Sequence, residues 1–302
     1  MKIRLFVIPL LLQPLFLLLA FSACASPEVE EIHPRNPAIV ELMTFNIRYG
    51  TANDGDFSWP ARRQHVEDVI RRERPDVLAI QEGLAFQLEE LASVLDGYSK
   101  FGQHRDGGLK GEFSGIYLRK GAAVLVDSGE LWLSPTPGQI GSKGWDAALP
   151  RMALWVDVQL NDGTNRPPSD GHNVVRIYGT HFDHRGEEAR LQSAKLLVDH
   201  AQGGPPAVFM GDFNAIEESA PMTAFVAANY QSAVATFAPL NTLGTFNGFK
   251  EADGGRRIDH IMYAPDFIPH DAQILDDCFD GIWPSDHFPV TAVLELLPAS
   301  QR

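Results

Sequence analysis

Polar side chains suited to metal binding and proton transfer recur at the ends of short apolar runs in this chain of 302 residues. Rigid strand ends hold the active-site side chains of many enzymes, so a set of such positions is typical of a catalytic site. Carboxylate and amide oxygens suit a hard cation such as Mg²⁺, and imidazole suits proton transfer near neutral pH. The side chains are Asn46, Glu82, His181, Asp212, Asn214, Asp259, Asp286 and His287.

Each of these residues also has an ordinary structural explanation. Asn46 suits a turn or a helix cap, Asp212 with Asn214 suits an Asx turn, and Asp259 suits a buried structural acid. These explanations are independent, and all of them would have to hold for the whole set to be accidental. Their joint occurrence in one chain therefore favours a catalytic site.

Six short segments, in this order along the chain, resemble the endonuclease/exonuclease/phosphatase (DNase I-like) superfamily. The resemblance implies an α/β (α+β) fold: a four-layer αββα sandwich of two packed mixed β-sheets with helices outside. It also implies phosphoesterase chemistry with a divalent metal. The segments are 44–48 (TFNIR), 81–83 (QEG), 179–184 (GTHFDH), 211–214 (GDFN), 257–261 (RIDHI) and 285–290 (SDHFPV).

The resemblance also implies a division of roles among the polar residues. Glu82 matches the main metal ligand, and Asn46 and Asp286 match positions that complete the shell or hold its waters. Mg²⁺ is the expected ion, with Mn²⁺ as an alternative, because both take oxygen ligands.

The remaining matched residues have roles around the phosphate. His287 matches the catalytic histidine and Asp259 the acid that orients it, so His287 is a candidate base for water. Asp212 matches a residue that positions the attacking water or protonates the leaving oxygen. Asn214 matches a residue that binds phosphate or water, and His181 one that donates to a phosphate oxygen.

Arg151, Tyr117 and Arg185 are candidate substrate-binding residues. Arginine forks suit phosphate, and Arg151 is the preferred clamp. Tyr117 stands where the family often has a tyrosine beside the phosphate, whereas Arg185 is equally explained as a surface charge. Substrate specificity is expected to come from loops at 50–58, 102–113, 135–148 and 241–255, whose residues show no recognisable pattern.

The elements that must position these residues alternate between strand and helix patterns. Apolar residues at helical spacing predict four helices, at 60–73 behind a Ser58 cap, and at 84–95, 187–200 and 220–228. Apolar runs rich in β-branched residues predict strands at 39–47, 76–80, 115–119, 122–126, 130–133, 152–160, 174–180, 207–210, 257–263 and 290–297. A polar stretch with two prolines at 161–173 predicts a turn.

Charge and missing motifs narrow the function. The formal net charge of −14 favours a small phosphorylated substrate over nucleic acid, because nucleic-acid binders usually carry a basic surface. An extracellular nuclease and a catalytically silent binding module remain the alternatives. The sequence contains no P-loop, dinucleotide-binding glycine motif or HExxH motif, and residues 111–115 miss a nucleophile elbow by one position.

The first residues indicate export. Lys2 and Arg4 precede an apolar run that ends in small residues and Cys24, the pattern of a secretory leader. Lipidation of Cys24 would give a bacterial lipoprotein anchor, and cleavage without lipid would give a secreted or periplasmic protein. We expect a leader at 1–24, a Pro- and Glu-rich tether at 25–37 and one domain at 38–298. That domain is expected to be a monomer that meets the membrane only through the lipid.

Overall fold

The computed structural model describes residues 38–160, 173–237, 243–250 and 255–302. The expected leader with Cys24, the tether and most of the turn expected at 161–173 lie outside the described residues. Within the described ranges, no helix is both long enough and apolar enough to cross a bilayer.

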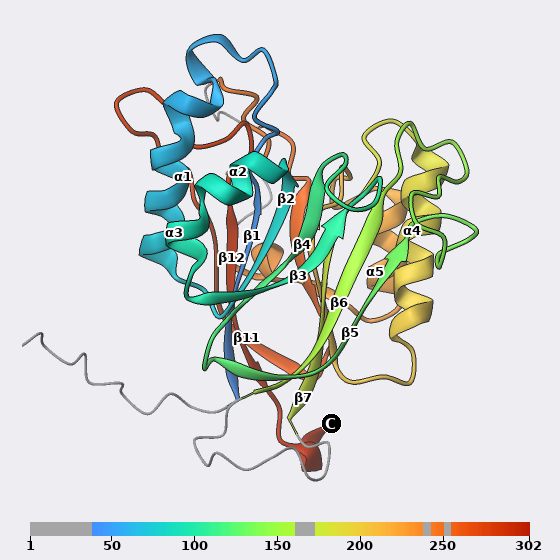
Figure 1. The fold of residues 1–302 in the computed structure, drawn as a ribbon. Coiled ribbons are helices and arrows are strands. Elements are labelled where there is room, and N and C mark those ends of the chain that lie inside the picture. Colours follow the sequence, from blue (N-terminus) through green and yellow to red (C-terminus); the bar gives the residue numbers. More distant parts are fainter. Residues whose placement is uncertain (1–37, 161–172, 238–242, 251–254) are drawn as a thin grey trace, which may run out of the picture. The chain divides into compact units, whose positions relative to one another are not determined.

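The described strands form two six-stranded mixed sheets that pack face to face (Figure 1). In spatial order, the first sheet contains β11 (Phe267–Ile274), β12 (Val290–Leu296), β1 (Ile39–Asn46), β2 (Val77–Gly83), β4 (Phe113–Arg119) and β3 (Tyr98–His104). The second contains β5 (Ala123–Trp132), β6 (Met152–Leu160), β7 (Val174–His181), β8 (Ala207–Asp212), β10 (Asp259–Tyr263) and β9 (Gln231–Ser232).

Helices cover the outer face of each sheet (Figure 1). The first sheet is covered by α1 (Trp59–Glu73), α2 (Ala85–Glu90) and α3 (Ala92–Leu95), and the second by α4 (Glu187–Ala201) and α5 (Ala220–Ala227). The short α6 (Ala233–Phe237) contacts β10 and β11, one strand from each sheet. The 3-10 turns are η1 (Gly55–Phe57) and η2 (Ala299–Gln301). The predicted sandwich of two packed mixed sheets with helices outside is confirmed.

Each sheet has one parallel strand pair at its centre, and the two pairs explain where the polar residues meet. In the first sheet β1 runs parallel to β2, with Asn46 opposite Gln81. In the second β7 runs parallel to β8, with His181 opposite Asp212. Carboxyl ends of parallel strands lie at one edge of a sheet, where open α/β folds bind their ligands. Both pairs therefore deliver polar side chains to their edge.

The alternation of side chains along a strand turns these residues inward. Val208 and Met210 of β8 pack between the sheets, whereas Ala207 and Phe209 pack against the helices. Continuing this alternation places Asp212 on the inter-sheet side. The same parity applies to Asn46 behind Val40 and Leu42, to His181 behind Val175 and Ile177, and to Asp259 ahead of Ile261 and Tyr263.

Several elements differ from the sequence expectation. The strands expected at 122–126 and 130–133 are one strand, β5, which bends at a register shift between Leu125 and Asp127. The helix expected at 84–95 is divided into α2 and α3 at Leu91. Ser58 occupies the N-cap position of α1, but its side chain makes no capping hydrogen bond.

Besides the two-residue β9, the strands β3 and β11 were not expected. Neither alternates cleanly, because β3 contains polar residues and Gly102, and β11 contains Pro269 at a register shift. Both are held by antiparallel pairing along nearly their whole length, β3 with β4 and β11 with β12. Pairing with a partner distant in sequence therefore decides these two strands.

Candidate active site

A cleft of about 830 Å³ lies at the edge where the two parallel pairs end. Six of the eight predicted polar residues line it: Glu82, His181, Asp212, Asn214, Asp286 and His287. The other two, Asn46 and Asp259, are buried directly behind these residues and hydrogen-bond to them. The structure thus brings all eight together from separate parts of the chain.

Asn46 connects the two sheets at the base of the cleft. Its Nδ2 donates to Glu82 Oε1 and to Asp212 Oδ2, each at 3.0 Å. Its Oδ1 accepts the backbone N–H of Arg48 at 3.0 Å, which fixes the orientation of the amide. One fully buried amide therefore sets the separation of two carboxylates that come from different sheets.

Glu82 reaches the cleft only because β2 is irregular. In the pairing of β2 with β4 the register shifts between Gln81 and Gly83, and Glu82 has φ of 63°. Without this irregularity, Glu82 would share the outward parity of Leu78 and Ile80, which pack against the helices. A left-handed, non-glycine residue carries a strain of about 1–3 kcal/mol and is often found at a functional site. Its Oε2 accepts the backbone N–H of Tyr49 at 3.1 Å.

His287 and Asp259 form a buried pair. His287 Nδ1 and Asp259 Oδ2 are 2.9 Å apart, and His287 Nε2 lies 3.9 Å from Asp212 Oδ2. Burial works against a charged imidazole, but the carboxylates of Asp259 and Asp212 together raise the pKa of His287 well above its usual value. His287 therefore keeps its proton at neutral pH. It suits a charged donor better than the base for water that the sequence suggested.

Asp212, unlike His287, is disfavoured in its charged form. Burial, with the charge of Asp259 added, raises the pKa of Asp212 to about 7. Its Oδ1 accepts the backbone N–H of Asn214 at 2.8 Å, and Asn214 Nδ2 donates to the carbonyl of Phe182 at 3.1 Å. A carboxylate with a pKa near the working pH can take a proton from water and release it again.

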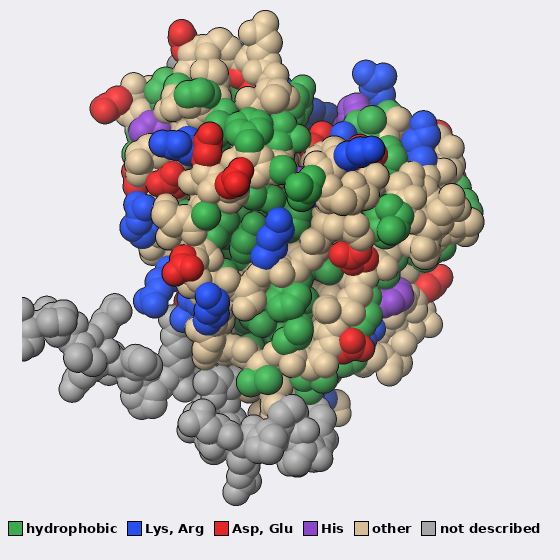
Figure 2. All heavy atoms as spheres, viewed as in Figure 1, with side chains coloured by type: hydrophobic (Ala, Val, Ile, Leu, Met, Phe, Trp, Pro, Cys, Tyr) green, Lys and Arg blue, Asp and Glu red, His purple; other side chains and the backbone are tan. Residues whose placement is uncertain are grey.

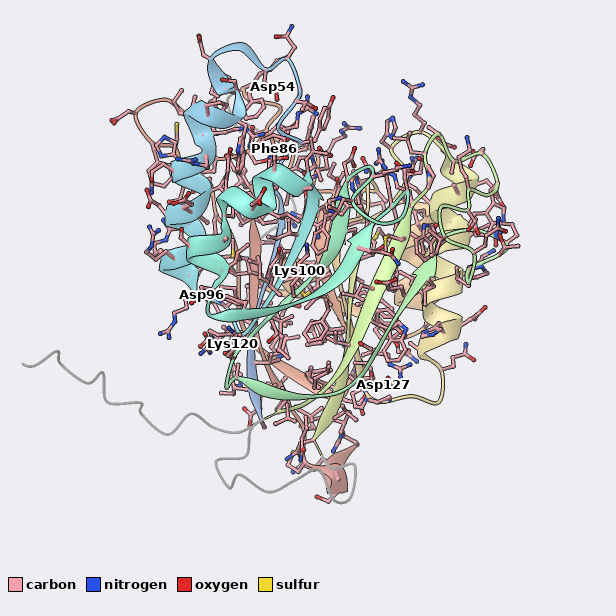
Figure 3. The ribbon with its side chains drawn as sticks, viewed as in Figure 1. Asp54, Phe86, Asp96, Lys100, Lys120 and Asp127 are labelled. Carbon is pink, nitrogen blue, oxygen red and sulfur yellow. The ribbon has the colours of Figure 1, made fainter. Side chains whose placement is uncertain are left out.

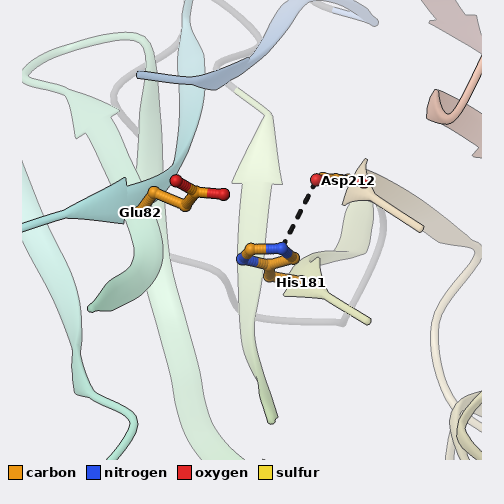
Figure 4. A group of neighbouring side chains, drawn as sticks. All are labelled: Glu82, His181 and Asp212. Carbon is orange, nitrogen blue, oxygen red and sulfur yellow. Dashed lines mark ion pairs between the residues drawn. The ribbon is translucent and has the colours of Figure 1, made fainter. Parts of the chain in front are cut away.

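His181 is held in one tautomer by Arg151. Arg151 Nη1 donates to His181 Nδ1 at 2.9 Å, and burial next to this positive charge lowers the pKa of His181 well below its usual value. The neutral ring therefore carries its proton on Nε2, which lies 3.4 Å from Asp212 Oδ2. Figure 4 shows His181, Asp212 and Glu82 converging from their separate strand ends, with the His181–Asp212 pair dashed.

The structure assigns Arg151 to different partners from those expected. Its side chain is only 5% exposed, and its second amino group, Nη2, donates to His184 Nδ1 at 3.2 Å. Arg151, the expected phosphate clamp, therefore uses two of its N–H groups to bind two histidines. Arg151 lines the cleft with its guanidinium bonded to His181.

Tyr117 and Arg185 are not brought into the cleft. Tyr117 packs with Phe113 in the hydrophobic cluster between the first sheet and its helices, and burial raises its pKa. The alternation along β4 explains this, because Ile116 and Leu118 face the other sheet. Arg185 is exposed and lies outside the residues that line the cleft.

Asp183, which follows His181, stabilises the loop around it. Burial opposes its ionisation, but four backbone N–H groups hold the pKa of Asp183 at about 2. The donors include those of Leu149 at 3.2 Å and Gly186 at 2.8 Å. This carboxylate therefore ties the segment before Arg151 to the start of α4.

Sequence reasoning missed Glu112 and Arg105. Glu112 lies in a loop expected to set specificity, but its Oε2 is 2.5 Å from Arg105 Nη1, 3.8 Å from Arg151 Nη1 and 3.9 Å from His181 Nδ1. Burial, together with the charge of Glu82, raises the pKa of Glu112. The antiparallel pairing of β4 with β2 could have indicated Glu112. This pairing brings the start of β4, directly after Glu112, to the end of β2 where Glu82 lies.

Arg62, which sequence reasoning also missed, ties together the loops that flank Asn46 and Asp286. It is fully buried on α1 and stacks on Trp59, with Cζ 5.0 Å from the ring centroid. Burial lowers its pKa to about 10. Its guanidinium donates to the carbonyls of Ile47, Arg48, Phe57 and Pro284.

Replacing Arg62 by Ala should lower the free energy of unfolding by about 3 kcal/mol or more, because several buried carbonyls lose their donor. Urea unfolding followed by circular dichroism measures this. The neighbouring Arg63 is 44% exposed and makes only surface ion pairs with Glu67 and Glu90. Arg63→Ala should change the same quantity by less than about 1 kcal/mol. Equal losses in the two variants would contradict the role of Arg62.

The oxygen donors of the cleft fit a hard divalent cation. Carboxylate oxygens of Glu82 and Asp212 lie within 4.8 Å of each other, next to the His181 ring that Arg151 holds. Asp286 lines the same cleft with Arg48 Nη1 3.5 Å from its Oδ2, and burial, together with the charge of Glu82, raises the pKa of Asp286. Buried carboxylates that repel one another are stabilised by a cation, and Mg²⁺ and Mn²⁺ take such ligands.

Comparison with known protein families shows which family this chain belongs to. The family described as "Endonuclease/Exonuclease/phosphatase family" matches residues 43–287. The chain belongs to this family. Divalent metals are usual among its enzymes, in keeping with the acidic and histidine groups of the cleft. A search among curated proteins finds no match.

Solved structures of the endonuclease/exonuclease/phosphatase family agree with this assignment. A Bacteroides vulgatus endonuclease/exonuclease/phosphatase is 32% identical, with 85% of this chain and 99% of that chain covered and a TM-score of 0.77. A mannosyl-6-phosphatase of Bacteroides thetaiotaomicron is 30% identical, with 84% and 99% covered and a TM-score of 0.75. The human nocturnin catalytic domain shares the fold, with a TM-score of 0.65. It is 18% identical, and the match covers 87% of this chain and 96% of that chain.

Proposed function

We propose that this chain is a Mg²⁺-dependent hydrolase that cleaves phosphate esters of small molecules outside the cytoplasmic membrane. The observation that carries the proposal is the link through Asn46, which holds Glu82 and Asp212 at either side of one cleft. An oxygen-rich metal site and a proton acceptor thus lie within reach of the same phosphate.

Asp212 is the group that takes the proton of the attacking water. Its pKa of about 7 leaves a large part of it ionised at neutral pH, so it can accept a proton and return it to solvent. Asn214 follows on the same turn and fixes one carboxylate oxygen through its backbone N–H. The other carboxylate oxygen lies near His181 and His287, where the phosphate would sit.

His287 and His181 supply donors to the phosphate. The Nε2–H of protonated His287 and the Nε2–H of neutral His181 approach the same oxygen of Asp212, from 3.9 and 3.4 Å. A phosphate oxygen between them would accept both hydrogen bonds as its negative charge grows. Glu82 and Asp286 would hold the cation, with Glu82 oriented by the N–H of Asn46. The cation, when bound, would neutralise a phosphate oxygen and orient the leaving group.

Cleft size and charge support a small substrate. A volume of about 830 Å³ accommodates a compact phosphorylated molecule. Acidic and basic side chains are interspersed on the face shown in Figure 2, without the continuous basic surface that a polynucleotide favours. The similarity to a mannosyl-6-phosphatase supports a phosphomonoester, and a sugar phosphate is the first substrate to test.

Location and assembly follow from the sequence alone. We propose export by the leader, followed by lipid attachment at Cys24, and a monomeric domain on the outer side of the cytoplasmic membrane. Metabolic labelling with a palmitate analogue, compared between the native chain and Cys24→Ser, would test the anchor. Equal labelling of both proteins would contradict it.

A metal-dependent assay tests the activity. The purified protein should hydrolyse sugar phosphates or p-nitrophenyl phosphate with Mg²⁺ or Mn²⁺, lose turnover with chelator and regain it when metal is added back. Glu82→Gln should need a higher metal concentration for half-maximal rate, whereas Glu89→Gln, a change at an exposed residue of α2, should not. Turnover of plasmid DNA alone would favour the nuclease alternative, and no metal-dependent turnover of any ester would favour the silent module.

A further inference from the structure

An ion pair in the cleft, next to a proposed metal ligand, takes no part in the chemistry above. Arg48 Nε and Nη2 donate to the two carboxylate oxygens of Asp54, at 3.2 and 2.9 Å, while Arg48 Nη1 lies 3.5 Å from Asp286 Oδ2. A guanidinium and a carboxylate paired in this way keep further N–H groups and further acceptor lone pairs. The pair therefore presents donors and acceptors side by side to the cleft.

Phe249 forms an apolar wall of the same cleft. Its half-buried ring stacks on Phe57 with the ring centroids 4.7 Å apart and an interplanar angle of 12°. Phe57 in turn stacks on Trp283 at 5.8 Å, and Arg62 Cζ lies 5.9 Å from the Phe249 centroid. Phe57 therefore supports one face of the ring and holds Phe249 in place where it lines the cleft.

Hydrogen bonds fix this wall relative to the metal ligands. Asn247 Oδ1 accepts the backbone N–H of Phe249 at 2.7 Å, and Asn247 Nδ2 donates to the carbonyl of Ser285 at 3.0 Å. Arg48 and Phe249 both have left-handed backbones, with φ of 55° and 57°. Such strain persists where the surroundings over-determine a conformation, and it is concentrated at binding sites.

The position of these residues relative to the attacking water indicates what they contact. Asp212 and Asn214 are assigned to the water and follow β8 of the second sheet. Arg48 and Asp54 follow β1 of the first sheet and adjoin Asp286. Attack in line with the breaking bond places the leaving group opposite the water. The leaving group therefore lies toward the ion pair and Phe249.

We infer that Arg48, Asp54 and Phe249 form a subsite for a polyhydroxylated, sugar-like leaving group, an inference that rests on the proposed function. Sugar hydroxyls both donate and accept, as the ion pair requires, and the C–H face of a sugar ring packs on a flat aromatic face. An aryl leaving group would leave the polar groups of the pair without partners, which lowers its relative rate.

Kinetic discrimination between two leaving groups tests the subsite. The full chain with Mg²⁺ is assayed on a panel of hexose 6-phosphates, mannose 6-phosphate among them, and on p-nitrophenyl phosphate. The readout is the ratio of kcat/KM for the best hexose phosphate to kcat/KM for the aryl ester. Asp54→Ala should lower this ratio by about tenfold, because it removes hydrogen bonds that only the sugar makes. A nitrophenyl ring can also stack on Phe249, so Phe249→Leu is read on the hexose phosphate alone, where kcat/KM should fall by about tenfold.

Two matched variants control for nonspecific effects. Asp56→Ala changes an exposed acid of the same loop, and Phe86→Leu changes a 38% exposed phenylalanine on α2. Neither residue lines the cleft, and both should leave the ratio unchanged. Figure 3 labels Asp54 on the loop after β1 and Phe86 on α2.

The possible results separate the subsite from the proposed function. A tenfold lower ratio in Asp54→Ala and a tenfold lower kcat/KM for the hexose phosphate in Phe249→Leu, with melting temperatures near that of the native chain, support the subsite. An unchanged ratio, or turnover of the aryl ester with no hexose phosphate accepted, overturns the subsite and leaves the phosphoesterase intact. Absence of metal-dependent turnover on both substrate types overturns the proposed function and the subsite together.

Discussion

Asp212→Asn is expected to lower kcat by about 10²–10⁴-fold, because the variant keeps the shape of the side chain but loses the proton acceptor. Asp212 is fully buried, and its pKa of about 7 shows that the ionised form is disfavoured in the folded state. An amide cannot ionise, so this penalty disappears. The amide has one acceptor oxygen, however, so it loses one of the two N–H bonds that Asp212 accepts from Asn46 and Asn214. The two effects oppose each other, and with chelator present the melting temperature of the variant should stay near that of the native chain.

In this prediction the rate falls while the stability is kept, which separates lost chemistry from lost folding. Steady-state kinetics on p-nitrophenyl phosphate with saturating Mg²⁺ gives kcat, and differential scanning calorimetry gives the melting temperature. Asp68→Asn, an exposed change on α1, serves as the matched control and should alter neither quantity. A kcat within about threefold of the native value would remove Asp212 from the role of base.

His287→Gln is also expected to lower kcat by about 10²–10⁴-fold, because glutamine cannot carry the positive charge that meets the phosphate. The same change leaves Asp259 buried beneath a neutral side chain, since its Oδ2 now pairs with His287 Nδ1 at 2.9 Å. Breaking a buried pair from one side typically costs about 3–5 kcal/mol of stability. The single variant should therefore be both slow and less stable.

A double variant distinguishes these two effects. His287→Gln combined with Asp259→Asn removes the uncompensated carboxylate, so most of the lost unfolding free energy should return. Turnover should remain as low as in the single variant, because the charged donor is still missing. Recovery of turnover together with stability would show that His287 acts through the fold alone.

Much of the fold follows from local patterns. The central strands β1, β2, β6, β7 and β8 were predicted within a few residues, because each is a continuous apolar run that must be buried on both faces. β3 was missed because its local sequence is weakly apolar and only its ladder with β4 makes it a strand. Propensity is a weak guide wherever tertiary pairing provides the stabilisation.

The residues of the candidate site likewise fall into those that local patterns could place and those that they could not. Strand alternation was sufficient in principle to turn Asn46, His181, Asp212 and Asp259 inward, because each shares the parity of inter-sheet core residues. The same alternation, once β4 is placed, turns Tyr117 away toward the helices. The placement of Tyr117 therefore required knowledge of which face of β4 meets the other sheet.

The sequence by itself determined which chemical groups are present, their order along the chain and the strands that end at them. Only the tertiary structure decided that Glu82 leaves the alternation of β2, that Arg151 holds His181 and that Glu112 lies beside them in the cleft. Register shifts and side-chain pairings of this kind depend on partners far away in the chain. The free energy that fixes them comes from contacts that exist only when both sheets are assembled.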